Sequence, residues 1–279
     1  MNYRDRVVLV TGASSGIGRQ VALDFGARGA RVALVARREE RLREVADACR
    51  AAGGGAEIFS GDLAESAFVA GLVDRVALQM GGLDVLINNA GIPKHKPIYG
   101  VTHGDVERTL RVNFLAPTHL LLDALPHMLV RGEGYLVNIS SAAGRIAPPR
   151  EAIYAASKFA LTGLSEGLAI ELAGSGIHCG VIHVGAIDTE IWERAASEAP
   201  VRFAGRKYPP SLISKAVFRC IEERRFELTA PGSLRLAFLF KALLPGLFRS
   251  GASRYDPVLP EVLEQARARA RALVGGSGR

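Results

Sequence analysis

The feature that most constrains the fold is a glycine-rich turn placed directly between a buried strand and a helix. The apolar run at residues 7–10 is typical of a buried strand, and the turn at residues 11–18 follows it at once. A helical pattern then covers about residues 17–28, and a second apolar strand covers residues 31–36. A strand, a turn, a helix and a second strand in this order form the βαβ unit of a parallel sheet.

The turn has the spacing G-x-x-x-G-x-G, with its glycines at Gly12, Gly16 and Gly18. Glycine lets the backbone turn tightly and come close to a pyrophosphate group, which binds at the positive N-terminus of the following helix. A glycine pattern alone is weak evidence, but its position between a strand and a helix strengthens it considerably. The turn therefore predicts a dinucleotide-binding site.

Helices and strands keep alternating along the chain. We expect further strands at residues 56–59, 83–87, 134–139, 177–183 and 226–229. We expect helices at residues 38–50, 65–80, 105–112, 114–130 and 212–224, and one that holds Tyr154 and runs to about Ala173. About seven strands alternating with helices predict an α/β chain with one doubly wound, mainly parallel sheet of the Rossmann type. No break in composition divides residues 1–230 into smaller domains.

Residues 231–279 form an extension of different composition. Residues 234–248 are strongly apolar but carry two cations and a Pro-Gly break, so they are too short and interrupted to span a bilayer. They could line a lipophilic substrate pocket, cover an interface between subunits or lie in a membrane surface. Residues 261–274 predict a polar, arginine-rich helix. The extension is thus either part of the same domain or a contact segment.

Charge and cysteine content exclude several other classes of protein. The formal net charge of +7 could attract nucleic acid, but the arginines are scattered without a basic block, so we expect a solvated basic surface and no nucleic-acid partner. Three unclustered cysteines indicate neither a disulfide framework nor a zinc site, and the six histidines lack metal-binding spacing. The charged start and the lack of a long apolar run indicate a cytoplasmic protein without a signal peptide or spanning helix.

Tyr154 and Lys158 form a pair whose helical spacing has chemical consequences. Residues four apart lie on one face of a helix, so the ammonium of Lys158 should lie beside the phenol of Tyr154. A nearby positive charge favours the phenolate of a tyrosine, whose ordinary pKa is about 10. Such a phenol can give or take a proton near neutral pH. A Tyr/Lys pair at this spacing also occurs on ordinary exposed helix faces.

The motifs together resemble those of the short-chain dehydrogenase/reductase superfamily in its single-domain form. The resemblance covers about residues 5–230 and implies a Rossmann-fold oxidoreductase that interconverts a carbonyl and a secondary alcohol with a nicotinamide cofactor. It rests on the turn at residues 11–18, Asp62, the segment 88–91, Asn113, Ser141 and Tyr154-x-x-x-Lys158, in that order.

The resemblance implies catalytic roles for four residues. Tyr154 would be the general acid in carbonyl reduction and the base in alcohol oxidation, while Lys158 would lower its pKa and bind the nicotinamide ribose hydroxyls. Ser141 fits the family's S-x-x-G register and would polarise the substrate oxygen, with the adjacent Ser140 as the alternative. Asn113 would hold a water molecule that links Lys158 to solvent.

The end of the second strand indicates which cofactor to expect. NAD-dependent enzymes normally place an acidic residue there, whereas an arginine accommodates the 2′-phosphate of NADP. Ala36 fills the acidic position, and Arg37 follows it with a guanidinium that can hold phosphate through two hydrogen bonds. We therefore expect NADP(H) to be favoured over NAD(H). The alternative is that Arg37 and Arg38 only begin a solvated helix, and Ser15 stands where some NADP-dependent members carry a second base.

The resemblance places further residues around the cofactor. Asp62 would meet the adenine, residues 89–91 would pack behind the cofactor, and Val184 replaces the family's proline after the sixth strand. The full predicted cofactor set is Gly12, Ser14, Ser15, Gly16, Ile17, Gly18, Arg37, Asp62, Leu63, Asn89, Ala90, Gly91, Tyr154, Lys158, Gly185, Ile187 and Thr189. No metal ligand is predicted.

These residues predict an NADP(H)-dependent oxidoreductase with a small-molecule carbonyl or alcohol substrate. Residues 191–208 would form a lid, and Ile191, Trp192 and Phe203 within it favour a lipophilic substrate. The alternative is a catalytically idle dinucleotide-binding sensor or scaffold, which would not need all four catalytic candidates. The resemblance implies a homodimer or homotetramer, since the family commonly forms these assemblies. A membrane surface that contacts residues 234–248 is a further candidate partner.

Overall fold

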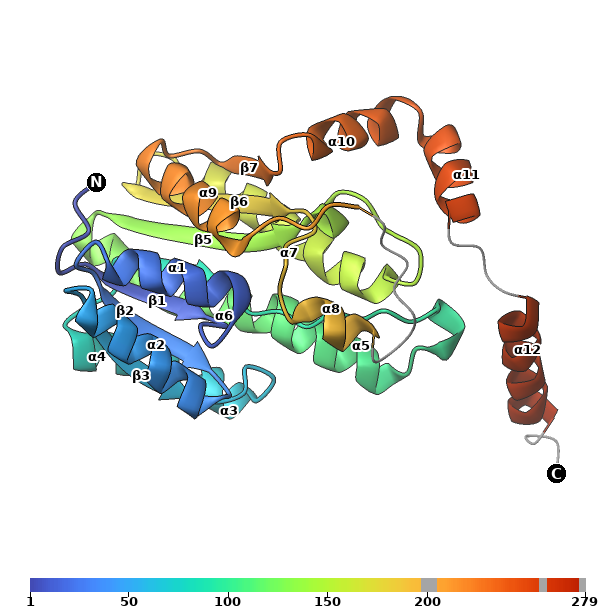
Figure 1. Ribbon diagram of the computed structural model, residues 1–279, viewed down its shortest axis with the longest axis horizontal. Coiled ribbons are helices and arrows are strands. Elements are labelled where there is room, and N and C mark those ends of the chain that lie inside the picture. Colours follow the sequence, from blue (N-terminus) through green and yellow to red (C-terminus); the bar gives the residue numbers. More distant parts are fainter. Residues whose placement is uncertain (197–204, 256–259, 276–279) are drawn as a thin grey trace.

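One seven-stranded, all-parallel sheet forms the centre of the molecule, as the alternation of elements predicted. The computed structural model describes residues 1–196, 205–255 and 260–275. The strand order is β3-β2-β1-β4-β5-β6-β7 (Figure 1). The strands are β1 (Val7–Thr11), β2 (Arg31–Ala36), β3 (Gly55–Ser60), β4 (Val85–Asn88), β5 (Gly134–Ser141), β6 (Ile177–Val184) and β7 (Glu227–Ala230).

Helices cover both faces of the sheet, so the strands are buried on both sides. One apolar core lies between the sheet and α1, α2 and α9, and a second lies between the sheet and α4, α6 and α7 (Figure 1). This explains the continuous apolar runs of the strands, because a strand covered on both faces has no solvent-facing side. The helices of the two layers are α1 (Gly16–Gly26), α2 (Glu39–Ala51), α3 (Ser66–Val69), α4 (Leu72–Met80), α5 (His103–Leu110), α6 (Ala116–Arg131), α7 (Ala152–Glu171) and α9 (Pro210–Glu222).

Two helical predictions differ from the structure at their boundaries. The helix expected at residues 65–80 is divided into α3 and α4, because Ala70 leaves the helical conformation (ψ 125°) and Gly71 adopts φ +66°. The break expected near Asn113 is absent, since a π-helical turn at Arg111–Leu115 joins α5 directly to α6. Single π-helical turns inside helices frequently mark functional sites.

The strand order creates a crevice at the carboxyl edge of the sheet. The chain passes outward through β1, β2 and β3 and then returns to place β4 on the other side of β1. Helices therefore diverge to opposite faces beyond the ends of β1 and β4, and ligands bind at such a point in open α/β sheets. The glycine-rich turn follows β1, and the segment 88–91 follows β4, so both predicted motifs lie at this crevice.

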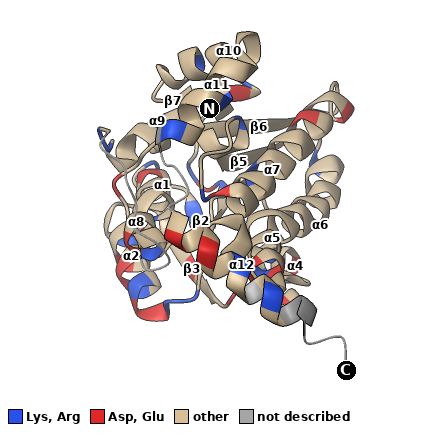
Figure 2. Cartoon of the chain, turned by 90° about the vertical axis from the view of Figure 1, so that its right-hand side faces the viewer, with Lys and Arg blue, Asp and Glu red and all other residues tan. Residues whose placement is uncertain are grey.

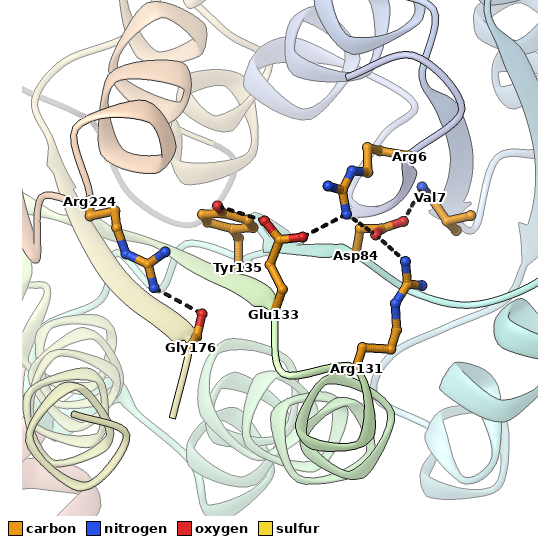
Figure 3. A network of polar contacts seen from close by, with 8 residues as sticks. All are labelled: Arg6, Val7, Asp84, Arg131, Glu133, Tyr135, Gly176 and Arg224. Atoms are coloured by element: carbon orange, nitrogen blue, oxygen red, sulfur yellow. Dashed lines mark hydrogen bonds and ion pairs between the residues drawn. The ribbon is translucent and has the colours of Figure 1, made fainter. Parts of the chain in front are cut away.

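A polar network closes the opposite, amino edge of the sheet (Figure 3). The buried carboxylate of Asp84 accepts hydrogen bonds from Arg6 Nη1 at 2.8 Å, Arg131 Nη2 at 2.8 Å and the backbone N–H of Val7 at 2.7 Å. Arg6 also contacts Glu133 at 2.9 Å. The network joins the start of β1 to the segments before β4 and β5, so it fixes the amino ends of the three central strands.

The extension continues from β7 as α10 (Leu234–Leu243), α11 (Pro245–Tyr255) and α12 (Pro260–Gly275). The apolar segment at residues 234–248 thus consists of α10 and the beginning of α11, separated near Pro245. Among the described residues, no helix is both long and apolar enough to cross a membrane.

Replacing Asp84 should destabilise the fold without touching the carboxyl-edge crevice. Asp84→Asn removes the charge that pairs with Arg6 and Arg131, so we expect the free energy of unfolding to fall by about 2–4 kcal/mol. Urea denaturation of both proteins measures the change. The matched control is Asp47→Asn, because Asp47 forms an exposed pair with Arg50 and should change stability by less than about 0.5 kcal/mol. Equal effects of the two substitutions would contradict the role given to the network.

Candidate functional site

The glycine-rich loop lies closer to its neighbours than any side chain would allow. Gly12 adopts φ +70°, and a Cβ there would lie 2.8 Å from Asn89 Nδ2. A Cβ on Gly18 would lie 2.3 Å from the carbonyl oxygen of Gly12, so Gly18 lets α1 pack directly against the loop. Gly16 adopts φ +55° and lies against Thr189, with 2.8 Å between its virtual Cβ and Thr189 Cγ2. Each of the three predicted glycines is therefore required by a different steric contact.

Thr11 and Asn89 connect this loop to the segment after β4. Thr11 Oγ1 accepts hydrogen bonds from the backbone N–H groups of Asn89 at 2.9 Å and Ala90 at 3.0 Å. Asn89 Nδ2 donates in return to the carbonyl oxygen of Thr11 at 2.8 Å. Three bonds therefore hold the two loops in one arrangement at the crevice.

A pocket runs along the carboxyl edge of the sheet from the end of β2 to α7 and brings together most of the predicted cofactor set. Ala36, Arg38, Arg108, Glu190 and Ile191 also line it. The predicted residues in its lining are Gly12, Ser14, Ser15, Gly16, Ile17, Arg37, Asp62, Leu63, Asn89, Ala90, Gly91, Tyr154, Lys158 and Thr189.

The other predicted cofactor residues pack behind the pocket or beside it. Gly18 supports the loop from inside, as its close approach to Gly12 shows. Gly185 packs against Pro231 and Leu234, and its virtual Cβ would lie 2.9 Å from each. Ile187 is buried and pairs with Tyr208 through a strand-like bridge. Phe203, expected in the lid, lies outside the described residues.

The N-terminus of α1 fits an anionic group. Its N-cap residue Ser15 forms no side-chain hydrogen bond to the helix backbone, and the first turn of α1 contains no acidic residue. The free N–H groups of a first helical turn, together with the helix dipole, favour a phosphate. With the close backbone approach at Gly12 and Gly16, these residues fit the pyrophosphate of a dinucleotide.

Arg38 is a functional candidate that the sequence interpretation assigned only to a solvated helix start. Its Nη2 donates to Ser15 Oγ at 2.7 Å and to Ser14 Oγ at 3.3 Å, while its Nη1 contacts Glu190 at 2.8 Å. The guanidinium of Arg38 therefore lies beside Ser15, where some family members carry a base. The adjacent arginines after β2 were a usable signal, but the contact with Glu190 joins residues 152 positions apart.

Arginines outnumber carboxylates at this end of the pocket. Asp62 faces Arg108 at 3.1 Å and Arg37 at 3.6 Å. Burial alone would raise the pKa of Asp62, but the N–H of Ala64 and the two guanidinium groups lower it below its ordinary value. Glu190 faces Arg38, Arg41 and Arg194, and these charges likewise outweigh burial and lower its pKa. Two ionised carboxylates therefore face five arginines.

Tyr154 lines the other end of the pocket together with Ser140, and Ser141 lies beside Tyr154 without being part of the lining. Burial has the largest effect and raises the pKa of Tyr154 above its ordinary value, the Glu151 carboxylate raises it further, and the neighbouring Ser141 hydroxyl opposes both effects. The lowering of this pKa expected from Lys158 is therefore not found, since the ammonium of Lys158 is not among the groups that shift it. Ser140 is buried differently, with its hydroxyl 3.1 Å from Thr162 Oγ1 and 3.3 Å from the carbonyl oxygen of Lys158. Of the two serines, Ser141 is the one that reaches Tyr154.

Lys158 is a buried cation whose ammonium makes one hydrogen bond to the part of the chain that the structure describes. Its Nζ donates to the carbonyl oxygen of Ile139 at 2.9 Å and lies 6.0 Å from the ring centre of Tyr154. The residue is 4% exposed, and burial lowers its pKa to about 8. The remaining hydrogen-bonding capacity of the ammonium is directed toward the pocket that Lys158 lines, which fits a group with hydroxyls.

Asn113 lies in the π-helical turn and is fully buried. Its Oδ1 accepts the N–H of Ile92 at 2.8 Å, and its Nδ2 donates to the carbonyl oxygen of Ile92 and to Ser157 Oγ, each at 3.0 Å. These bonds attach the loop after β4 to α7, one residue from Lys158. Asn113 is therefore placed to position the loop against the catalytic candidates.

The match to known families agrees with this geometry. Residues 6–200 match the family model described as short chain dehydrogenase. A relative from Thermotoga maritima, named an uncharacterized oxidoreductase, is 34% identical over 90% of this chain and 96% of its own. An Arabidopsis thaliana relative, named 11-beta-hydroxysteroid dehydrogenase-like 2, is 34% identical over 88% of this chain and 79% of its own.

Solved structures show the same fold. A short-chain dehydrogenase from Sphingobium yanoikuyae in complex with NADPH has a TM-score of 0.76 and 30% identity, covering 91% of this chain and 97% of that one. A short chain dehydrogenase/reductase from Burkholderia phymatum in complex with NAD has a TM-score of 0.80 at 24% identity, covering 93% and 99%. Structural neighbours thus hold either cofactor.

Removing the Lys158 charge should stabilise the protein in a pH-dependent way. Below pH 8 the lysine is protonated in both the folded and the unfolded chain, so folding carries the full cost of burying the charge; that cost fades as the pH rises from 8 toward 10.5. Lys158→Met should therefore raise the free energy of unfolding by up to about 3 kcal/mol at pH 7. The gain should shrink in denaturant titrations at pH 9 and 10.

The control for this prediction is Lys215→Met, because Lys215 is exposed on α9. Its stability difference from the wild type should not change over the same pH range. A gain at Lys158→Met that stays constant from pH 7 to pH 10 would contradict the lowered pKa.

Proposed function

The chain belongs to the short-chain dehydrogenase/reductase family and is an NAD(P)-dependent oxidoreductase, and on this premise we propose that it interconverts a carbonyl and a secondary alcohol, with NADP(H) favoured and a lipophilic substrate. The observation that carries the proposal is that Tyr154 and Lys158 line one end of a pocket whose other end is the glycine-rich loop, with Ser141 beside Tyr154. The bound cofactor would supply the hydride, and the protein would supply positioning and protons.

Tyr154 is the proton donor in reduction and the acceptor in oxidation. Ser141, whose hydroxyl lies beside Tyr154, donates to the same substrate oxygen and stabilises the negative charge that develops there. Lys158 binds the ribose hydroxyls of the cofactor. Asn113 is a positioning residue, because it does not itself line the pocket and its bonds hold Ile92, which does, and Ser157.

NADP(H) is favoured by the charge at the end of β2. Ala36 offers no carboxylate to a ribose 2′-hydroxyl, whereas Arg37 and Arg38 both line the pocket beside it. The excess of arginines over Asp62 and Glu190 leaves the region positive, which suits a 2′-phosphate. The sequence suggested Arg37 as the phosphate-binding arginine. Arg38, whose guanidinium is hydrogen-bonded to Ser15, would be a second one.

A lipophilic substrate is supported by the described part of the lid. Helix α8 (Ile191–Ala196) places Ile191 in the pocket lining, and the indole of Trp192 donates to the carbonyl oxygen of Ile187 at 2.7 Å. The name of the Arabidopsis thaliana relative, a hydroxysteroid dehydrogenase-like protein, points to the same class of substrate.

We also infer a cytoplasmic homodimer or homotetramer with residues 1–230 as its catalytic domain. Exposed apolar side chains on α6 and α7 support self-association, among them Leu122 (57% exposed), Val130 (90%) and Ile170 (71%). Their burial between subunits would remove apolar surface from water.

Tyr154→Phe should lower kcat by about 10²–10⁴-fold while leaving the cofactor Kd nearly unchanged, because it removes the transferable proton and little else. Turnover is followed at the nicotinamide absorbance with a panel of apolar ketones, apolar alcohols and small polar keto compounds. Retained turnover in the variant would overturn the assignment of Tyr154. Activity confined to the small polar compounds would overturn the lipophilic substrate.

Arg37→Ala and Arg38→Ala should each weaken NADPH binding by about 10–100-fold and change NADH binding little, because each removes a charge-assisted contact with the 2′-phosphate. Fluorescence titration of both cofactors gives the two affinities. Arg43→Ala, on the exposed side of α2, is the control and should leave both affinities unchanged. An unaltered NADPH/NADH ratio in both pocket variants would contradict the cofactor preference.

A further inference from the structure

The strongest unassigned feature is an apolar surface on the extension, which we call the outer face. It consists of Leu236, Leu239, Phe240, Leu243, Leu244 and Leu247, which are between 44% and 72% exposed. The α10 positions follow the spacing i, i+3, i+4, i+7 of a single helix face, and Leu244 and Leu247 continue it into α11. A contiguous exposed apolar surface of this kind marks a contact with another phase or molecule.

The opposite face of α10 attaches the helix to the rest of the protein. Phe238 packs against the buried ring of His183 at 6.0 Å between ring centres, and Leu234 packs on Gly185. Lys241 Nζ donates to the carbonyl oxygen of Arg145 at 2.5 Å and lies 4.9 Å from the ring centre of Phe159. Because this inward face already has its partners, the outer face is a separate surface rather than an incompletely packed core.

The charged side chains within residues 228–255, which carry the outer face, all have one sign. Residues 228–255 contain four cations and no Asp or Glu. Three of these cations, Arg235, Arg249 and Arg254, are exposed, and none of them forms an ion pair with another described residue. Figure 2 shows α10 at the rim of the molecule, with most of its length uncharged. The surface therefore combines apolar side chains with unpaired positive charge.

We propose that the outer face of α10 and α11 docks the protein on an anionic membrane surface. Apolar side chains would enter the boundary between headgroups and acyl chains, while the arginines would contact acidic lipid headgroups. Binding at the surface fits a segment that is apolar on one side only, since no described helix can cross a bilayer.

The charge pattern favours a lipid surface over a second copy of the chain. A twofold interface brings the same surface of both subunits together. The arginines around two outer faces would then lie near one another with no carboxylate from residues 228–255 to balance them. An anionic membrane, in contrast, supplies the opposite charge.

The docked face lies next to the candidate site. Helix α10 begins just beyond the carboxyl end of β7, on the same edge of the sheet as the pocket (Figure 1). Arg145, whose carbonyl oxygen accepts from Lys241, lies in the segment between Ser141 and Tyr154. Docking would therefore bring the substrate side of the molecule toward the lipid. The proposal itself is independent of the reaction catalysed.

Vesicle co-sedimentation of the full-length protein tests the proposal. We expect binding to vesicles of phosphatidylcholine with phosphatidylserine, and weaker binding to phosphatidylcholine alone or in 0.5 M salt, where the Debye length is only about 4 Å. Leu239→Asp/Leu243→Asp should reduce vesicle binding by at least about tenfold, because it places two charges on the apolar face. Arg249→Glu/Arg254→Glu should reduce binding to the anionic vesicles but not to vesicles of phosphatidylcholine alone.

Matched controls are Leu78→Asp on α4, whose side chain is 87% exposed, and Lys215→Glu on α9. Both should bind vesicles as the wild type does, and thermal unfolding checks that every variant is folded. Unchanged vesicle binding in the leucine variant overturns the proposal. The proposal is also overturned if the wild type does not bind vesicles and the leucine variant forms a smaller oligomer than the wild type in sedimentation velocity. The outer face would then join two copies of the chain. Neither result depends on turnover, so a failure here is distinct from a failure of the proposed reaction.

Discussion

The close approach of backbone to backbone around Gly12 and Gly18 is the constraint on which the site depends. Because no Cβ fits there, α1 can start against the loop, and Thr11 and Asn89 can join the ends of β1 and β4. The positions of the other pocket-lining segments depend on this junction. The Asn113 bonds to Ile92 then extend it from the loop after β4 to α7, where the catalytic candidates lie.

The two ends of the pocket use opposite electrostatic arrangements. At the phosphate end, Arg37 and Arg38 remain partly accessible to solvent, and carboxylates hold the guanidinium groups in place. At the catalytic end, burial disfavours the charged forms of both Tyr154 and Lys158, so the phenol keeps its proton more readily and the ammonium loses its proton more readily than in water. A group that enters between them can shift these equilibria, since little solvent competes for the same hydrogen bonds.

Much of the fold and site could be predicted because the relevant signals are local. The strand at residues 31–36 matches β2 to the residue, since strands buried on both faces are continuous apolar runs bounded by turn residues. The helix break at Gly71 also has a local cause, the positive φ of this glycine, but the helical pattern continues on both sides of it and the break was therefore not predicted. The position of Arg38 on Ser15 and Glu190 could not be predicted, because it depends on a contact between distant segments. The burial that raises the pKa of Tyr154 likewise comes from tertiary packing, which helical spacing does not reveal.

The Asp84 network closes the edge of the sheet that carries none of the pocket-lining loops (Figure 3). The stabilising network therefore lies at the amino edge of the sheet, and the residues that carry the chemistry lie at its carboxyl edge. Loops after β2, β4, β5 and β6 can vary in length and composition while the amino ends of the central strands stay in register. Such a division makes a scaffold evolvable: substrate range can be altered, by selection or by design, through loop exchange at one edge, with little loss of the stability provided at the other.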